Sequence, residues 1–213
     1  MTVKKAVAAK IIRLLEEEYP DASLALNFSN PLQLLVSTIL AAQCTDKRVN
    51  DVTKELFKKY KKAEDFKRVK TNVLEKDISS ISFYRNKASN IRECCKIIVE
   101  KYGNNVPSTV EELTSLPGIG RKTANIVLGN AFDQSAIAVD THVLRVSTRI
   151  GLATSKNPDK VEKELCEVIP GGKWTRICYL FQAHGRATCK AKNPSCPDCI
   201  LFDICEWKDK RSK

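Results

Sequence analysis

The architecture of this chain is set by residues 114–132, TSLPGIGRKTANIVLGNAF. The segment breaks at a Pro-Gly pair and resumes helical character by Lys122, which predicts two helices joined by a tight hairpin at about residues 116–122. Because glycine has no Cβ, Gly118 and Gly120 permit positive φ angles and a close approach to an anion, at which the second helix points its first N–H groups. The hairpin therefore predicts a backbone grip on phosphate, with an ordinary tight turn between helices as the alternative.

Helical spacing continues on both sides of the hairpin. Apolar residues recur at steps of three and four, as at Val49, Val52 and Leu56, and no segment alternates convincingly with a period of two. Only the short apolar run at 136–139 is compatible with a strand. The sequence therefore predicts an all-α fold.

Several helix boundaries are marked by residues that favour them. An Asn-Pro pair suits a helix start, and a glycine suits the exit from a helix. The predicted boundaries are starts at Asn30-Pro31 and Asn157-Pro158, a capping box from Ser108 to Glu111, and an exit at Tyr102-Gly103.

The charge balance favours an anionic partner. The 213 residues include 36 basic and 25 acidic side chains, a net charge of +11, while 43% are apolar and can form a core. The longest apolar stretch, residues 32–44, is interrupted by polar side chains and cannot span a bilayer, and the N-terminus lacks the apolar core of a secretion signal. We therefore expect a cytosolic chain, nucleoid-associated in a prokaryote, that binds nucleic acid and no membrane.

Four of the nine cysteines fall within 17 residues, with the spacing C-x6-C-x2-C-x5-C. In a reducing compartment such a group indicates a metal site before it indicates disulfides, and four thiolates suit either tetrahedral zinc or an iron–sulfur cluster. The spacing alone does not choose between these, and a reduced loop without metal is the third possibility. These four are Cys189, Cys196, Cys199 and Cys205, whereas the other five, Cys44, Cys94, Cys95, Cys166 and Cys178, are expected in the core.

Lys122 and Asp140 have surroundings that suit nucleophilic chemistry. Lys122 lies beside Arg121 at the positive end of the second hairpin helix, which favours a neutral, nucleophilic amine. Asp140 precedes Thr141 at a predicted helix start, where backbone N–H groups keep a carboxylate ionised and able to stabilise positive charge. The alternatives are a phosphate-binding or solvated lysine, and a carboxylate that only caps a helix.

Two segments resemble a known family. LPGIGRKTANIVL at 116–128 and AVDTHVLRVSTRIGL at 138–152 resemble the helix-hairpin-helix DNA glycosylases, and within them the endonuclease III family of base-excision repair enzymes. The similarity runs from about Leu24 to Cys205.

The resemblance implies an architecture of two helical domains with a DNA cleft between them. One domain is a six-helix barrel module at 24–133 that contains the hairpin, and the other is an iron–sulfur domain formed by 1–23 together with 134–213. The implied protein is a monomer that acts on double-stranded DNA containing damaged bases or abasic sites.

The activity implied by the resemblance is that of a bifunctional glycosylase and abasic-site lyase for oxidised pyrimidines. The Lys122 amine attacks C1′ of a flipped nucleotide, Asp140 stabilises the positive charge that develops on the sugar, and the resulting Schiff base permits β-elimination. Lysine at position 122 favours this activity over that of a monofunctional mispair glycosylase, which has another residue there. A noncatalytic iron–sulfur DNA-binding module is the remaining alternative.

The resemblance also implies a cofactor and several DNA contacts. In that family the same cysteine spacing ligates one [4Fe–4S] cluster, and Lys190 and Lys192, between the first two ligands, are expected to face DNA phosphates. Gln43, in LAAQCTD, matches the residue that fills the space left by the flipped base, and Phe83, in ISFYRNKA, matches an intercalating wedge. Ser82 departs from the family, which has glycine before the wedge.

Both histidines, Phe83 and Gln43 allow more than one interpretation. His142, next to the predicted cap, is expected to contact DNA, whereas His184 is expected to satisfy a local hydrogen bond. The alternative for Phe83 is a buried aromatic in a helical core, and the alternative for Gln43 is a polar helix end.

Overall fold

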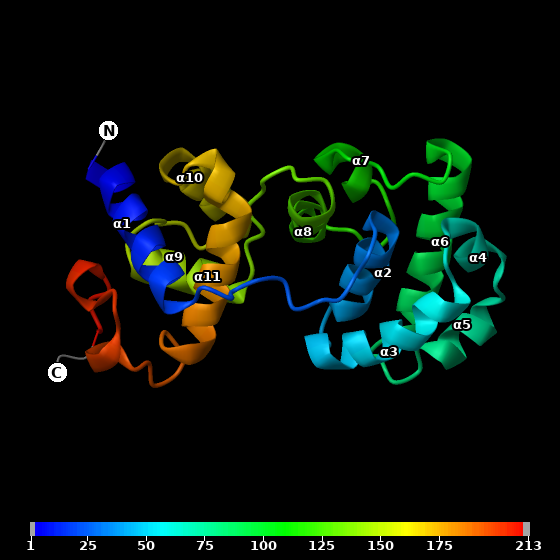
Figure 1. The fold of residues 1–213 in the computed structure, drawn as a ribbon, viewed down its shortest axis with the longest axis horizontal. Coiled ribbons are helices and arrows are strands. Elements are labelled where there is room, and N and C mark those ends of the chain that lie inside the picture. The colour runs from blue at the N-terminus through cyan, green and yellow to red at the C-terminus, as the bar shows by residue number, and fades with distance from the viewer. Residues whose placement is uncertain (1–2, 211–213) are drawn as a thin grey trace. The chain divides into compact units, whose positions relative to one another are not determined.

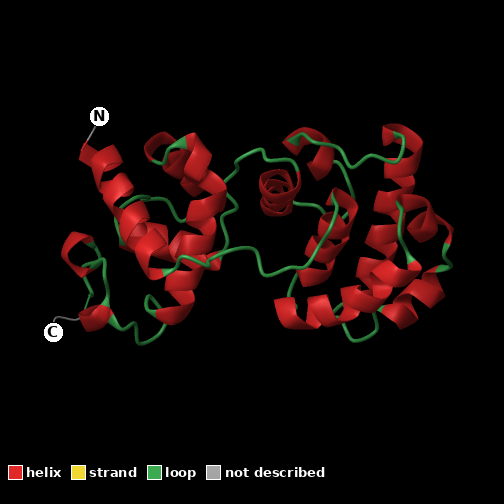
Figure 2. Ribbon diagram, viewed as in Figure 1, coloured by secondary structure: helices red, strands yellow, loops and turns green. Residues whose placement is uncertain are grey.

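The structure is a computed structural model that describes residues 3–210. Over this range the chain forms helices, irregular loops and three short 3₁₀ turns, with no strand (Figure 1 and Figure 2). The α-helices are α1 Val3–Glu18, α2 Pro31–Ala41, α3 Asp46–Lys59, α4 Ala63–Arg68, α5 Thr71–Asp77, α6 Tyr84–Tyr102, α7 Val110–Thr114, α8 Arg121–Ala131, α9 Thr141–Arg149, α10 Pro158–Val168 and α11 Trp174–Ala187.

The all-α prediction is thus confirmed for the part of the chain that the structure describes. The run at 136–139 is an extended loop whose residues Ile137 and Val139 are buried, and it pairs with no strand there. Within the same residues no helix is both long enough and apolar enough to cross a membrane.

The chain divides into two compact units. The contiguous unit runs from Ala25 to Gln134 and contains α2 to α8. The discontinuous unit combines the described residues up to Leu24 with those from Ser135 onward, so that α1 belongs with α9, α10 and α11.

In the contiguous unit, α6 is the central packing element. Helices α2, α4 and α5 contact it, and α2 also contacts α3 and α8. The buried face of α6 includes Ala88, Ile91, Cys95 and Ile98, which recur at steps of three and four as an amphipathic helix requires. Gly103, with φ +56°, ends α6 as its exit glycine, as the sequence predicts.

In the discontinuous unit, α11 packs against α9 and α1, and α10 contacts both α9 and α1. Apolar residues from all four helices form one core, among them Ile11, Val146, Leu165 and Phe181. Arg176 of α11 donates hydrogen bonds to the carbonyl oxygens of Tyr19, Pro20 and Ala22, which follow α1. These bonds hold the end of α1 to a helix more than 150 residues later in the chain.

The predicted helix starts at Asn30 and Asn157 are confirmed, because each side chain accepts hydrogen bonds from backbone N–H groups of its helix. The capping box is displaced by one residue. Thr109, not Ser108, is the N-cap of α7: its hydroxyl accepts from the Glu112 N–H and donates to the Glu112 carboxylate. Two Thr/Ser-x-x-Glu patterns overlap here, and α7 uses the second, from Thr109 to Glu112.

The five cysteines outside the C-terminal group are only partly in the core. Cys94, Cys95 and Cys178 are buried as predicted, whereas Cys44 and Cys166 are half-buried. Cys44 lies in the turn after α2 and Cys166 lies near the end of α10, where each helix reaches the surface.

Candidate functional site

The hairpin between α7 and α8 holds its two glycines in different conformations. Gly118 has φ +79°, in the left-handed region, and a Cβ on it would lie 2.7 Å from Nδ2 of Asn90 in α6. Gly120 is the N-cap of α8 with φ −92° and ψ 171°, an extended conformation open to any residue. The expectation of a positive φ therefore holds for Gly118 and is wrong for Gly120, because α8 begins at Arg121 and an N-cap is extended.

Neither the backbone angles nor the surroundings of position 120 require a glycine there. Apart from the adjacent residues and the backbone of α8 itself, no heavy atom lies within 4 Å of a Cβ placed there. Gly120 also has no side chain with which to cap α8. A glycine at this position leaves the positive end of α8 open to an anion from outside the chain. Lys122, in the first turn of α8, is exposed like both glycines.

Gln43 and Phe83 lie on two loops of the contiguous unit that a hydrogen bond joins. Ser82 Oγ donates to the carbonyl oxygen of Gln43 at 2.6 Å. Phe83 is 63% exposed, so the alternative of a buried core aromatic is wrong for it. Gln43 is exposed two residues after the end of α2, and both residues have left-handed backbones, with φ +54° and +55°.

Lys87 reinforces the same two loops from inside the unit. It lies in α6, is 5% exposed, and its Nζ donates to the carbonyl oxygens of Leu40 at 2.9 Å and Ala42 at 2.5 Å. An ammonium group at the end of α2 satisfies carbonyls that lack partners in the helix and complements the negative end of its dipole. Burial lowers the pKa of Lys87, an effect that the nearby Cys44 opposes.

Asp140, in the discontinuous unit, is the N-cap of α9. Its Oδ1 accepts hydrogen bonds from the backbone N–H groups of His142 at 2.8 Å and Val143 at 2.7 Å. The predicted cap is therefore present, and one carboxylate oxygen is sufficient to make it. The second oxygen, Oδ2, stays available for another partner.

His142 and Arg145 connect the start of α9 to the segment that carries the first cysteine of the group. Arg145 donates to the carbonyl oxygens of Gly185 and Cys189, and its Nη2 lies 3.1 Å from Nδ1 of His142. Burial lowers the pKa of His142, and the neighbouring Asp140 opposes this shift. The imidazole is therefore neutral at neutral pH and acts as a hydrogen-bonding group there.

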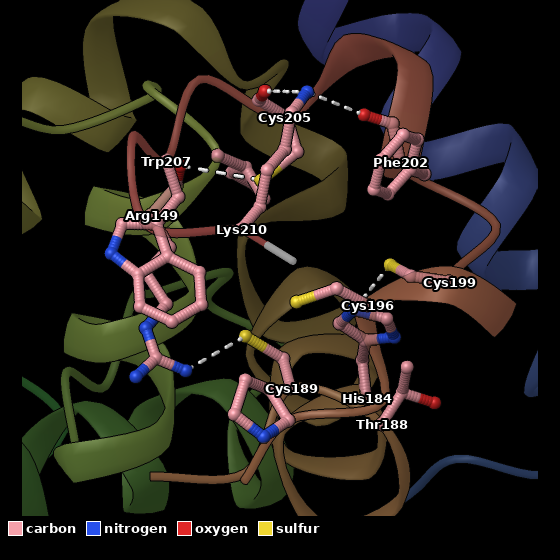
Figure 3. A pocket seen from close by; sticks show the side chains of 12 residues that line it. Arg149, His184, Thr188, Cys189, Cys196, Cys199, Phe202, Cys205, Trp207 and Lys210 are labelled. Atoms are coloured by element: carbon pink, nitrogen blue, oxygen red, sulfur yellow. Dashed lines mark hydrogen bonds between the residues drawn. The ribbon is translucent and has the colours of Figure 1, made fainter. Parts of the chain in front are cut away.

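The four grouped cysteines line one pocket of the discontinuous unit. Figure 3 shows the sulfur atoms of Cys189, Cys196 and Cys199 turned toward the middle of this pocket. Within residues 3–210, no group of three or more Cys, His, Asp or Glu is arranged for a single metal ion.

Burial makes two of these thiols, those of Cys199 and Cys205, reluctant to ionise on their own. It raises the pKa of the Cys199 thiol to about 11 and raises the pKa of Cys205 as well. Thiolates in this pocket therefore need compensating positive charge, which bound metal supplies.

Polar groups in the pocket wall contact the cysteine sulfurs. Arg149 donates through Nη1 to Sγ of Cys189 at 3.5 Å, and its guanidinium lies 4.0 Å from the ring centre of Trp207. Nε2 of His184 lies 3.6 Å from Sγ of Cys199. These groups can hold ligand thiolates in position by hydrogen bonding to sulfur.

His184 differs from its prediction, and Arg149 and Trp207 are pocket residues with no predicted role. His184 is fully buried, and besides Cys199 it contacts the Tyr19 hydroxyl at 3.2 Å, a residue 165 positions earlier, so its hydrogen bond is not local. Trp207 could have been predicted at the pocket from the sequence, because it lies two residues after the last cysteine. Arg149 and His184 lie further from the cysteines in the sequence, and no local pattern indicates their place in the pocket.

Lys190 and Lys192 are exposed on the loop that follows the first cysteine. Arg149 also donates hydrogen bonds to backbone carbonyl oxygens of this loop.

Comparison with known proteins reveals extensive similarity. Residues 36–171 match the family model described as "HhH-GPD superfamily base excision DNA repair protein". The chain is 47% identical to "Endonuclease III" of Bacillus subtilis over 92% of this chain and 90% of that protein, and 44% identical to "Endonuclease III" of Synechocystis over 96% and 94%. Among solved structures, "Structure of a Trapped Endonuclease III-DNA Covalent Intermediate: Estranged-Adenine Complex" aligns with a TM-score of 0.89 at 43% identity, over 97% of each chain.

Proposed function

The chain belongs to the HhH-GPD superfamily of base excision DNA repair proteins, and within it to the endonuclease III family, and from this membership we propose that it is a bifunctional DNA glycosylase and abasic-site lyase. One observation carries the proposal: a structural relative of nearly the full length, 43% identical, is a covalent intermediate of endonuclease III with DNA. A covalent intermediate requires a nucleophile, and its presence distinguishes a lyase from an enzyme that only removes the base.

Lys122 is the proposed nucleophile. Its amine forms a bond to C1′ of a nucleotide flipped from the duplex, and the bond from C1′ to the damaged base breaks as the base departs. The departing base takes up a proton that the amine releases, and opening of the C1′–O4′ bond of the sugar gives a Schiff base. Loss of a C2′ proton then breaks the C3′–O bond by β-elimination, which cuts the strand 3′ to the lesion. The exposed position of Lys122 in the first turn of α8, two residues after Gly120, supports this role, because the hairpin that grips the phosphate also carries the amine.

Asp140 is the proposed carboxylate that stabilises the positive charge developing on the sugar. The alternative is that Asp140 only caps a helix. Only one of its two carboxylate oxygens makes the cap hydrogen bonds, which weakens this alternative. Oδ1 accepts both cap hydrogen bonds, and Oδ2 can face a substrate without loss of the cap.

The DNA contacts follow from the same proposal. Gly118 and Gly120 form the phosphate grip, Gln43 fills the space of the flipped base, and Phe83 enters the base stack. Three further residues of the discontinuous unit, His142, Lys190 and Lys192, are proposed to contact the DNA backbone. The exposure of Phe83 supports its role, because a wedge must be free to enter the duplex.

We also propose that Cys189, Cys196, Cys199 and Cys205 hold a [4Fe–4S] cluster, which makes the discontinuous unit the iron–sulfur domain and the contiguous unit the six-helix barrel module. The fit rests on four thiols that line one pocket, with Arg149 and His184 beside two of the sulfurs. Bound iron–sulfur would supply four iron–thiolate bonds that fix the loop between Cys189 and Cys205. The chain's own residues then perform the reaction.

Borohydride trapping on a duplex with a single thymine glycol tests this function. Borohydride reduces a Schiff base to a stable protein–DNA adduct, which we expect from the wild type and not from Lys122→Ala. Lys163→Ala is the matched control, since Lys163 is an exposed lysine of α10 outside the proposed site. Base release without an adduct would indicate the monofunctional mispair glycosylase, and duplex binding without either product would indicate the noncatalytic module.

A further inference from the structure

We propose that Ser82 and Lys87 are positioning residues that lock Gln43 and Phe83 into one preformed wedge, so that the two side chains enter a duplex together. This pair of residues is termed the wedge clamp. The inference rests on the proposed function, which assigns Gln43 and Phe83 to the base stack.

The backbone of the wedge is held in a conformation that it would otherwise avoid. Gln43 and Phe83 both occupy the left-handed region, with φ +54° and +55°, which is unfavourable for residues with a Cβ. Such angles persist only where neighbouring contacts impose them. Ser82 and Lys87 both supply such contacts, since the Ser82 hydroxyl bonds to the Gln43 carbonyl and the Lys87 N–H bonds to the Phe83 carbonyl.

Ser82 joins the two loops directly. Its hydroxyl donates to the carbonyl oxygen of Gln43 itself, and its own backbone leads into Phe83, so one hydrogen bond of 2.6 Å couples both wedge residues.

Lys87 fixes the helices behind the loops. It lies one turn into α6, where its backbone N–H donates to the carbonyl oxygen of Phe83, while its ammonium group donates to Leu40 and Ala42 at the end of α2. The helix that follows Phe83 is thereby attached to the helix that precedes Gln43. Because Lys87 is buried, water competes little for these bonds.

A preformed wedge lowers the cost of opening the duplex, because its residues need no ordering when they insert. The clamp should therefore influence the step in which a base is unstacked. It should not influence attack on a sugar that is already accessible, such as an abasic site in single-stranded DNA.

The test compares wild type, Ser82→Ala and Ser82→Thr, with Ser80→Ala as the matched control. Ser80 is an exposed serine two residues earlier and makes none of the side-chain hydrogen bonds described for residues 3–210. Stopped-flow fluorescence of 2-aminopurine beside a thymine glycol reports unstacking, and single-turnover borohydride trapping reports chemistry. The same trapping on a single-stranded abasic oligonucleotide bypasses the wedge.

We expect Ser82→Ala to slow both duplex signals about three- to tenfold, as loss of one hydrogen bond allows, and to leave trapping on single-stranded DNA unchanged. Ser82→Thr should restore the duplex rates, and in a Gln43→Ala background Ser82→Ala should have less than a twofold effect. Equal unstacking rates for wild type and Ser82→Ala, or an equal loss on both substrates, would overturn the proposal. Absence of any wild-type adduct would instead refute the proposed function, and the fluorescence signal would still test the clamp.

Discussion

Gly118 and Gly120 are separated by a single residue, yet the chain needs glycine at only one of them. At Gly118 a side chain would be strained by φ +79° and would press on Asn90, whereas at Gly120 it would meet open space. We expect Gly118→Ala to lower the free energy of unfolding by about 1–2 kcal/mol. Gly120→Ala should cost less, about 0.5–1 kcal/mol, because alanine is a poorer N-cap than glycine.

The same two variants should rank in the opposite order for DNA. If a phosphate approaches Gly120, a methyl group there should weaken duplex binding at least about fivefold, by the loss of roughly one hydrogen bond to a charged group. Guanidinium unfolding and fluorescence anisotropy with a labelled duplex measure the two effects. Unchanged affinity of Gly120→Ala would leave the hairpin as an ordinary turn.

Tyr60 gives a prediction for pH dependence. Its hydroxyl donates to Asp77 at 2.7 Å, and burial, followed by this bond, raises the pKa of Tyr60 to about 12. The unfolded chain releases this proton near pH 10, so the stabilisation is complete below pH 10 and is lost as pH rises toward 12. Tyr60→Phe should cost about 1 kcal/mol at pH 8, and its difference from wild type should shrink above pH 10.

Urea unfolding at a series of pH values tests this expectation. Tyr84→Phe is the control, because the Tyr84 hydroxyl makes none of the hydrogen bonds described for residues 3–210. A difference between wild type and Tyr60→Phe that stays constant from pH 8 to pH 12 would contradict the linkage.

At the scale of the element, the helix-capping role of Asp140 at the start of α9 can be separated experimentally from its proposed chemical role. Asparagine caps a helix about as well as aspartate, so Asp140→Asn should unfold within about 0.5 kcal/mol of wild type, whereas Asp140→Ala should lose about 1 kcal/mol. Both variants lose the charge and should slow base release from thymine glycol at least about a hundredfold, a typical effect for a group that stabilises transition-state charge. If Asp140→Asn released the base as fast as wild type, the role of Asp140 would be limited to capping α9.

Elements whose signals lie within a few residues were predictable from the sequence. The starts of α2 and α10, the exit of α6 and the hairpin before α8 all depend on local backbone chemistry, and the structure has them where the residues indicate. The predicted start of α7 is wrong by one residue, because two equivalent Ser/Thr-x-x-Glu patterns overlap and the local sequence does not choose between them.

Contacts between distant elements were not predictable in this way. Lys87 resembles any lysine of an amphipathic helix, and only folding brings it to the end of α2, 47 residues away from Leu40. The contact of His184 with Tyr19 and Cys199 likewise depends on how α11 packs against α1. The cysteine spacing identified the four pocket cysteines as a group, whereas Arg149 in the pocket wall became apparent only in three dimensions.

At the scale of the whole molecule, the division into two units predicts the effect of losing the proposed cluster. All four cysteines belong to the discontinuous unit, so Cys199→Ser should loosen the loop that carries Lys190 and Lys192 and should leave residues 25–134 folded. Limited trypsin digestion should then cleave near these lysines at least about tenfold faster than in wild type, which corresponds to roughly 1.4 kcal/mol of local opening.

Cys166→Ser is the matched control, because Cys166 is a half-buried cysteine of the same unit that lies outside the pocket. Mass spectrometry of the fragments identifies the cleavage sites. If trypsin cleaved Cys199→Ser early at many sites within residues 25–134, the two units would not unfold separately and the prediction would be wrong.

The discontinuous unit also imposes an order on biosynthesis. Helix α1 leaves the ribosome first, but its packing partners α10 and α11 are translated only after the whole contiguous unit, roughly 8–30 s later at 5–20 residues per second. During that interval the contiguous unit can fold as the chain emerges, while α1 keeps its apolar face, which includes Ile11 and Leu15, without those partners. Nascent chains stalled before α10 should therefore contain a protected middle segment and an N-terminal helix accessible to chaperones.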